Sequence, residues 1–208
     1  MPNDQRAMPA PALRLCYRKS PLFARHTPEP LSVRLRDNET KKIVNLTDYR
    51  DYKKMKLRIY IDTSVISGYF DEEFREATIM LFQRLENREV KFVISDLLDL
   101  ELIKAPSHVK ELIFNYPADF FERVELTDEV LKLADTYIEE EVVGKTSIED
   151  CRHIAMATIY KVDVLASWNF KHIVNLDKIK GYNSVNLRLG YTMIEIRSPK
   201  DLVKYEDE

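Results

Sequence analysis

Short apolar runs alternate with amphipathic stretches along the chain from Arg58 onward. Several runs, such as "IYI" and "FVI", are continuously apolar, which is typical of strands in a parallel sheet covered on both faces. Because helical patterns separate these runs, we predict an α/β fold, a three-layer α/β/α sandwich with a mainly parallel central sheet. The predicted strands are 58–62, 91–95, 121–126, 163–167 and 192–197, and the predicted helices are Glu73–Asn87, Asp96–Ala105, Ser107–Asn115, Asp128–Val142 and Ile148–Tyr160, with a turn or two from Asn169.

The chain divides near Met55 into two segments of different composition. Residues 1–57 hold 13 Lys and Arg and 6 Asp and Glu, whereas residues 58–208 hold 19 and 29. We therefore expect residues 1–54 to be a basic, Pro-rich extension, disordered or peripheral, with a short hairpin or helix within 31–54. Residues 55–208 are the predicted folded domain, and Met55 is a candidate natural start. A basic arm that binds nucleic acid is the alternative role of the extension.

Composition narrows the class of protein. A hydrophobic fraction of 45% with 10% aromatic residues supports a packed core. The two cysteines, Cys16 and Cys151, lie far apart and predict neither a disulfide framework nor a zinc site, so we expect a reducing, cytoplasmic compartment. No apolar stretch approaches the roughly 18 residues that cross a membrane, and residues 1–30 lack the apolar core of a secretory signal.

An aspartate stands at the end of the first predicted strand. Ligands of open parallel sheets bind beyond the carboxyl ends of the strands, which makes Asp62 in "RIYIDTSVI" a candidate site residue. Asp62 could also cap the following turn, but Thr63 and Ser64 could do so equally well. Capping alone therefore does not require an acid at this position.

A second candidate acid, Glu101, lies in "SDLLDLELIKAP", the predicted helix after the second strand. Its leucines and Ile103 make this helix apolar nearly all round, so we expect it to be largely buried. Asp96 suits the first helical turn because of the helix dipole, and Asp99 suits a solvent-facing position. Glu101 has no such explanation, and its structural alternative is a partly exposed surface acid.

Two more candidates come from the last third of the chain. In "KTSIEDCRHIAMATIY", a capping box could pair Ser147 with Asp150 or Thr146 with Glu149, and only the second would leave Asp150 free in the first helical turn. In "VDVLASWNFKHIVN", Asn169 follows the end of a predicted strand and offers a neutral oxygen acceptor. Its structural alternative is a turn residue or a helix cap.

Acidic side chains gathered at one sheet edge repel each other unless a cation joins them. Hard oxygen ligands suit Mg²⁺ or Mn²⁺ rather than zinc, and His153 and His172 are weaker ligand candidates. The chain lacks a G-x-S-x-G elbow, which disfavours acyl transfer. It also lacks a G-x-G-x-x-G sequence and a P-loop, which disfavours dinucleotide or NTP binding.

Four segments taken together, "IYIDTSVI", "ISDLLDLELI", "IEDCRHIAMA" and "DVLASWNFKHI", resemble the PIN-domain family in their order and spacing. They are similar in particular to VapC-like toxin ribonucleases of a subgroup with an S-W-N-F-K-H motif, as is the closing "YNSVNLRLGYTMIEIRSPKDL". The resemblance covers about residues 57–203. It implies a PIN-like three-layer fold and a Mg²⁺- or Mn²⁺-dependent ribonuclease, which in many members is the toxin of a toxin–antitoxin pair.

The resemblance also implies a site. Its metal-binding positions fall on Asp62, Glu101 and Asp150, with Ser64 (or Thr63) near the metal-bound water. The usual fourth acid falls on Asn169 or on His172, so the site loses one negative charge. The implied reaction is hydrolysis of RNA by a metal-activated water, and the implied partners are an RNA substrate, a cognate antitoxin and a second copy of the chain.

Several features of the sequence bear on alternative functions. The acidic balance of residues 58–208 opposes RNA binding, so Lys145, Arg152 and Lys171 are candidate local contacts. That balance and Asn169 favour the alternative, a catalytically weak or inactive PIN-like module that binds RNA or protein. The absence of a D-x-D pattern disfavours a phosphatase-like role for Asp62.

The apolar stretch 112–121 predicts either a helix of the core or an interface with another molecule.

Overall fold

The structure, a computed structural model, describes residues 56–204. The expectations about residues 1–54, including a hairpin or helix within 31–54, lie outside the described residues. The described elements are, in chain order, β1 (Leu57–Ile61), α2 (Thr63–Gly68), α3 (Arg75–Glu86), β2 (Val90–Ser95), α4 (Asp96–Leu102), α5 (Ser107–Phe114), η1 (Ala118–Phe120), β3 (Phe121–Val124), α6 (Asp128–Glu139), η2 (Lys145–Ser147), α7 (Ile148–Ile159), β4 (Val164–Ala166), α8 (Leu176–Arg188), β5 (Ile196–Arg197) and η3 (Pro199–Leu202).

The five strands form one sheet, in the order β3-β2-β1-β4-β5, and every neighbouring pair is parallel. The central strand is β1, where Ile59 pairs with Phe92 of β2 on one side and with Val164 of β4 on the other. The chain extends the sheet from β1 through β2 to β3 and then returns to add β4 beside β1. The strand order therefore reverses between β1 and β4, the place where open α/β sheets bind their ligands.

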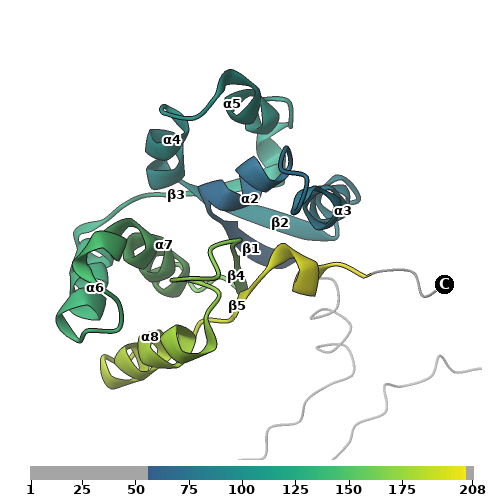
Figure 1. Cartoon of the computed structure of the whole chain (residues 1–208). Helices are drawn as coiled ribbons and strands as arrows, with labels where there is room; N and C mark the ends of the chain where they lie inside the picture. The colour runs from purple at the N-terminus through teal and green to yellow at the C-terminus, as the bar shows by residue number, and fades with distance from the viewer. Residues whose placement is uncertain (1–55, 205–208) are drawn as a thin grey trace, which may run out of the picture. The chain divides into compact units, whose positions relative to one another are not determined.

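Helices cover both faces of the sheet (Figure 1). Ile59 and Ile61 of β1 pack in one core with α2, α3, α4 and α5, whereas Tyr60 packs in the other core with α6, α7 and α8. Successive side chains of β1 thus enter opposite cores, which is why the strand is apolar throughout. The predicted three-layer α/β sandwich with a parallel central sheet is confirmed.

Helix α8 was missed by the sequence analysis, which expected only turns after Asn169. Its buried face carries polar side chains: Asn183 exchanges hydrogen bonds with the main chain of Ile194, at 2.8 and 3.1 Å. The buried amide of Asn186 accepts from the Tyr137 hydroxyl at 2.5 Å. The inner face therefore combines these asparagines with the apolar Tyr182 and Val185, which interrupts the apolar periodicity that marks a helix. The last strand is also much shorter than the predicted 192–197.

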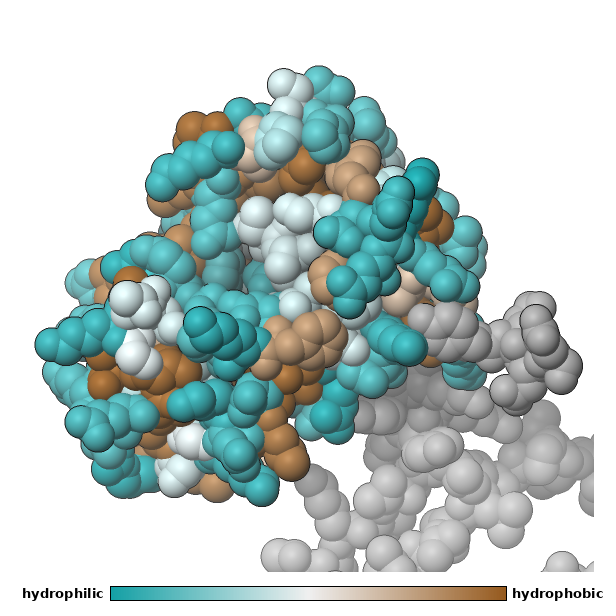
Figure 2. All heavy atoms as spheres, in the orientation of Figure 1, coloured by the Kyte–Doolittle hydropathy of each residue, from teal (hydrophilic) through white to brown (hydrophobic). Residues whose placement is uncertain are grey.

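The prediction that the helix containing Glu101 is largely buried was wrong. Only one side of α4 packs in the core, through Leu98 and Leu102. Leu100 and Ile103 are 57% and 67% exposed, because no other element of the described chain covers that side. Apolar patches also interrupt the largely hydrophilic surface in Figure 2. In the stretch 112–121, Leu112 and Ile113 at the end of α5 are buried, whereas Phe114 is 78% exposed, so the stretch contains both core and surface residues. Among residues 56–204, no helix has the length and apolar character to span a membrane.

Candidate functional site

Asp62 leaves the central strand as the first residue after β1 and is both a helix cap and a buried acid. Its Oδ1 caps α2 by accepting the Val65 N–H at 3.2 Å, and it also accepts the Ser64 hydroxyl at 2.6 Å. Its Oδ2 accepts the Ser167 hydroxyl at 2.6 Å. The residue is only 4% exposed, and this burial raises the pKa of the Asp62 carboxyl above its ordinary value.

The Asp62–Ser167 contact bridges the switch point of the sheet. Ser167 follows the last residue of β4, and β4 is the strand beside β1 where the order reverses. A second contact links the same two strand ends, since the Trp168 N–H donates to Ser64 Oγ at 2.8 Å. Sequence reasoning missed Ser167, although its position at a strand end is the same signal that singled out Asp62.

Glu101 reaches the same edge from α4. The Thr63 hydroxyl donates to its Oε2, and His153 Nε2 lies 3.2 Å from both carboxylate oxygens. Burial alone would raise the pKa of this half-buried carboxyl, but the hydrogen bond and charge of His153 outweigh it, so the pKa lies below its usual value. Glu101 is therefore ionised at neutral pH and can only accept hydrogen bonds.

His153 on α7 is the main residue whose role sequence reasoning did not find. It is 3% exposed, with Nε2 at Glu101 and Nδ1 2.7 Å from the buried Tyr60 hydroxyl. Burial lowers the pKa of the ring, but the hydrogen bond and charge of Glu101 raise it more, and the net pKa lies above the ordinary value. The sequence carries one usable signal, because His153 stands three residues after Asp150 and so shares its helix face.

Asp150 lies in the first turn of α7, and neither predicted capping box forms there. The residue that precedes the helix is Ser147, whose side chain makes no capping hydrogen bond. The Asp150 side chain is instead free to meet Asn169, whose Nδ2 donates to its Oδ1 at 2.9 Å. Partial burial raises the pKa of the Asp150 carboxyl, and the positive charges of His172 and His153 reduce that effect.

Asn169 is a turn residue, and it contacts a site acid through its side-chain nitrogen rather than through the oxygen acceptor expected from the sequence. Its Oδ1 accepts the His172 N–H at 3.1 Å and so stabilises the turn after β4, while its Nδ2 contacts Asp150. Its own N–H donates to Ser167 Oγ at 2.9 Å. The position whose side chain contacts a site acid is thus Asn169.

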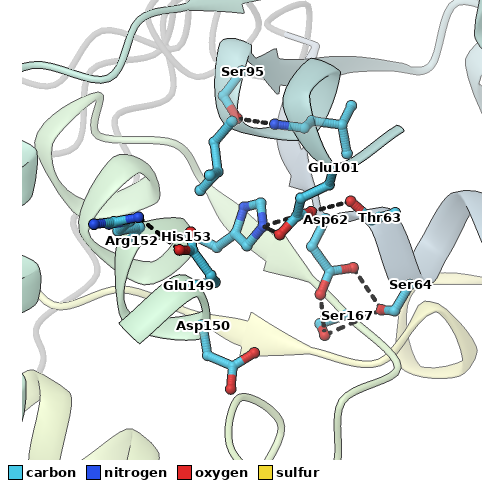
Figure 3. Close-up of polar contacts among 12 residues, drawn as sticks. Asp62, Thr63, Ser64, Ser95, Glu101, Glu149, Asp150, Arg152, His153 and Ser167 are labelled. Atoms are coloured by element: carbon cyan, nitrogen blue, oxygen red, sulfur yellow. Dashed lines mark hydrogen bonds and ion pairs between the residues drawn. The ribbon is translucent and has the colours of Figure 1, made fainter. Parts of the chain in front are cut away.

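Figure 3 shows how these side chains lie at the edge of the sheet: the carboxylates of Asp62 and Glu101 lie near His153, and Asp150 extends from α7 below them. All three predicted acids are therefore brought to one end of the sheet. Within residues 56–204, however, no group of three or more His, Cys, Asp or Glu side chains is arranged to hold a metal ion. The oxygens of Asp62 and Glu101 are instead engaged by hydroxyl, imidazole and main-chain donors.

The three predicted basic contacts differ in their surroundings. Arg152 lies on α7 beside the site, and its Nη1 forms an ion pair with Glu149 at 2.6 Å. Lys171 is exposed, two residues after Asn169. Lys145 lines a separate surface hollow that it shares with Lys178, and none of the site acids lines that hollow.

Comparisons with known proteins give matches among solved structures only. No protein-family model and no curated protein matches the chain. DNA-bound VapBC from Salmonella typhimurium is 15% identical, over 69% of this chain and 98% of that chain, with a TM-score of 0.45. VapBC2 from Rickettsia felis, bound to a DNA fragment from their promoter, is 12% identical over 68% and 98%, with a TM-score of 0.44. The sarcin–ricin loop cleaving toxin VapC20 from Mycobacterium tuberculosis is 8% identical over 54% and 91%, with a TM-score of 0.42. Similarity at this level assigns no function to the chain, so its function is proposed from the residues of the site.

Proposed function

We propose that the chain is a Mg²⁺- or Mn²⁺-dependent endoribonuclease of the PIN-domain type, which hydrolyses RNA phosphodiester bonds. One observation carries the proposal: Asp62, Glu101 and Asp150 come from three separate elements to the carboxyl end of the sheet, at its switch point. A buried or half-buried acid costs folding free energy. Three of them at the edge that binds ligands are explained by a cation that they share.

The chemistry of the donor set fits a hard divalent cation, because carboxylate oxygens are the ligands that Mg²⁺ and Mn²⁺ prefer. Burial raises the pKa of the Asp62 carboxyl, and a nearby positive charge would offset this effect. Since the three acids are not arranged to hold a metal ion as they stand in the described residues, binding would require their side chains to move, and Glu101 or Asp150 to leave a present hydrogen bond. A bound cation would lower the pKa of a coordinated water and neutralise charge on the phosphate.

The residues around each acid hold it in place. Ser64 and Ser167 orient the two oxygens of Asp62. Thr63 and His153 do the same for Glu101. Asn169 orients Asp150 and, as a neutral amide, leaves the site with three acids, which favours one cation over two. Partners of this kind set the orientation and basicity of metal ligands.

RNA binding has to overcome the acidic balance of the domain. Arg152 and Lys171 flank the site and would contact phosphates there. Lys145 is a weaker candidate, because it lines a different hollow. We extend the proposal to a toxin of a toxin–antitoxin pair, with a cognate antitoxin as a partner. The basis for this extension is the four sequence segments that resemble VapC-like proteins.

A second candidate function is a PIN-like module that binds RNA or protein without cleaving it. It is favoured by Asn169, which takes the place of the family's usual fourth acid and occupies an oxygen of Asp150. The two candidates differ in whether RNA is cleaved, and not in the fold.

Cleavage of mixed RNAs by the purified full chain, in Mg²⁺, Mn²⁺ or EDTA, tests the proposal. We expect cleavage that requires a divalent cation and is lost in Asp62→Ala. Asp177→Ala, which removes a fully solvated acid from α8, is the control and should cleave normally. RNA that is bound but stays intact in both cations would support the binding module, and equal cleavage in EDTA would contradict metal dependence.

A further inference from the structure

A buried series of hydrogen bonds connects the candidate site with the core. The Tyr60 hydroxyl oxygen lies 2.7 Å from His153 Nδ1 and 2.8 Å from Ser95 Oγ. Tyr60 and Ser95 are 0% exposed. Ser95 is the N-cap of α4, where its Oγ accepts the Leu98 N–H at 3.2 Å, and Glu101 lies farther along the same helix. Because His153 Nε2 contacts Glu101, the series runs from the N-cap of α4 to a residue within α4.

Counting hydrogens fixes the tautomer of a neutral His153. Ionised Glu101 accepts only, so the ring hydrogen has to be on Nε2. Nδ1 is then an acceptor, which takes the Tyr60 O–H, and Tyr60 in turn accepts the Ser95 O–H. Each of these polar atoms has a partner in this arrangement, as buried groups require.

The same geometry also serves the protonated ring. Nδ1–H would then donate to the Tyr60 oxygen, and the Tyr60 O–H would turn to Ser95 Oγ, which has room for a second donor. A hydroxyl is able to make this exchange because it both donates and accepts. The Nε2–H of His153 therefore stays on Glu101 in either protonation state.

We propose that Tyr60 is a positioning residue of the site: its hydroxyl holds His153 with Nε2–H directed at Glu101, and so fixes the orientation of that carboxylate. The hold on His153 stands on the hydrogen-bond geometry alone. Its consequence for a cation rests on the proposed function, in which Glu101 is a ligand. Ser95 is the outer member of the series and connects the N-terminus of α4 to the same hydroxyl.

The tautomer of His153 can be read by ¹⁵N NMR of the ring nitrogens in the metal-free full chain, at alkaline pH, with His153→Gln for assignment. We expect hydrogen on Nε2 in the wild type, with Nδ1 as a hydrogen-bonded acceptor. In Tyr60→Phe the hydrogen should stay on Nε2, because ionised Glu101 still accepts it, but the Nδ1 resonance should move to that of an acceptor without a donor. Tyr137→Phe is the matched control, because Tyr137 is an equally buried tyrosine of the same core whose hydroxyl donates to Asn186 at 2.5 Å and not to His153. It should leave His153 unchanged.

Two results would overturn the inference: hydrogen on Nδ1 in the wild type, or an Nδ1 resonance that is the same in Tyr60→Phe and the wild type. If Tyr60→Phe does not fold, the wild-type spectrum decides, because an Nδ1 without a hydrogen-bond donor in the wild type would also overturn the inference. Titration with Mn²⁺, followed by electron paramagnetic resonance, tests the consequence for Glu101. Tyr60→Phe should weaken Mn²⁺ binding about tenfold and Tyr137→Phe should not. Equal affinity in Tyr60→Phe and the wild type would contradict positioning of Glu101, whereas a wild type that binds no Mn²⁺ would contradict the proposed function and leave the NMR result to decide the role of Tyr60.

Discussion

The side-chain amide of Asn169 donates a 2.9 Å hydrogen bond to Asp150 Oδ1. An aspartate at position 169 would place a second carboxylate against the first, and like charges at this distance raise each other's pKa and destabilise the fold. A shared cation would reverse this effect. We therefore expect Asn169→Asp to lower the melting temperature in EDTA and to gain more stability than the wild type when Mn²⁺ is added.

The control for that measurement is Asn175→Asp. Asn175 caps α8 through its Oδ1, an interaction that an aspartate keeps, and it contacts none of the site acids. Its melting temperature should not respond to Mn²⁺ more strongly than that of the wild type. A similar response in both variants would refute a cation between positions 150 and 169.

Replacing Asp62 by Asn should stabilise the protein at neutral pH. Burial raises the pKa of Asp62 in the folded state, so at a pH between the unfolded-state and folded-state pKa the folded chain binds more protons than the unfolded chain. The contribution of Asp62 to the free energy of unfolding therefore falls as the pH rises through this range. Above that pH range Asp62 is ionised in the folded protein, and the buried charge lowers the free energy of unfolding by its full amount. Asp62→Asn removes the charge and keeps a capping oxygen, so we expect a gain of about 0.5–2 kcal/mol at pH 7.5, together with loss of cleavage.

Urea unfolding of Asp62→Asn and the wild type at several pH values measures this effect. The difference should shrink as the pH is lowered toward the unfolded pKa. Asp119→Asn provides a contrast, because the hydrogen bond from Arg88 lowers the pKa of Asp119, and removal of that carboxylate should destabilise slightly at pH 7.5. A less stable Asp62→Asn at every pH would be inconsistent with a destabilising charge at this position.

Gly68 lies against the indole of the chain's single tryptophan, at the end of α2. A Cβ at this position would come within 2.7 Å of Trp168 Nε1, and the ring has little room to move because it stacks on Phe74. We expect Gly68→Ala to lose about 1–3 kcal/mol of stability and to change the tryptophan fluorescence of the folded protein. Gly144→Ala meets no atom within 4 Å and should change neither, so an unperturbed Gly68→Ala would show that this packing is looser than described.

Substitutions on the two sides of α4 should change the free energy of unfolding by different amounts. Leu98 is fully buried, so Leu98→Ala should cost about 2–5 kcal/mol. Leu100 is 57% exposed, and Leu100→Ala should change stability by less than about 0.5 kcal/mol. Urea unfolding of the purified variants measures both values. A large loss from Leu100→Ala would mean that a partner or a second copy covers this side in solution.

The fold could be predicted from the sequence where apolar periodicity reports burial. The strand of Ile59 and Ile61 enters two cores, so its apolar run was readable without a structure. Helix α8 was not, because Asn183 and Asn186 occupy its inner face. The exposed side of α4 was misread for a related reason: apolar letters show which residues could be buried, but not whether another element covers them.

Some residues of the site could also be predicted from the sequence, whereas their hydrogen-bond partners could not. The position of Asp62 followed from the end of an apolar strand, whereas its partner Ser167 is 105 residues away. The link from Tyr60 to His153 spans 93 residues and lies within the core, where a tyrosine reads simply as an apolar position. Spacing along the sequence indicates which residues reach one sheet edge. It does not indicate which hydroxyl or imidazole holds each acid there.

Binding of Mn²⁺ to the metal-free full chain, measured by isothermal titration calorimetry, decides whether the three acids act as one cation site. We predict one bound Mn²⁺ per chain in the wild type. Glu101→Gln and Asp150→Asn should each weaken it at least about tenfold, since each removes a charged ligand while keeping the shape of the side chain. Asp177→Asn, on the exposed surface of α8, should bind as the wild type does. Equal Mn²⁺ affinity in all four proteins, or no binding by the wild type, would contradict a cation site formed by Asp62, Glu101 and Asp150.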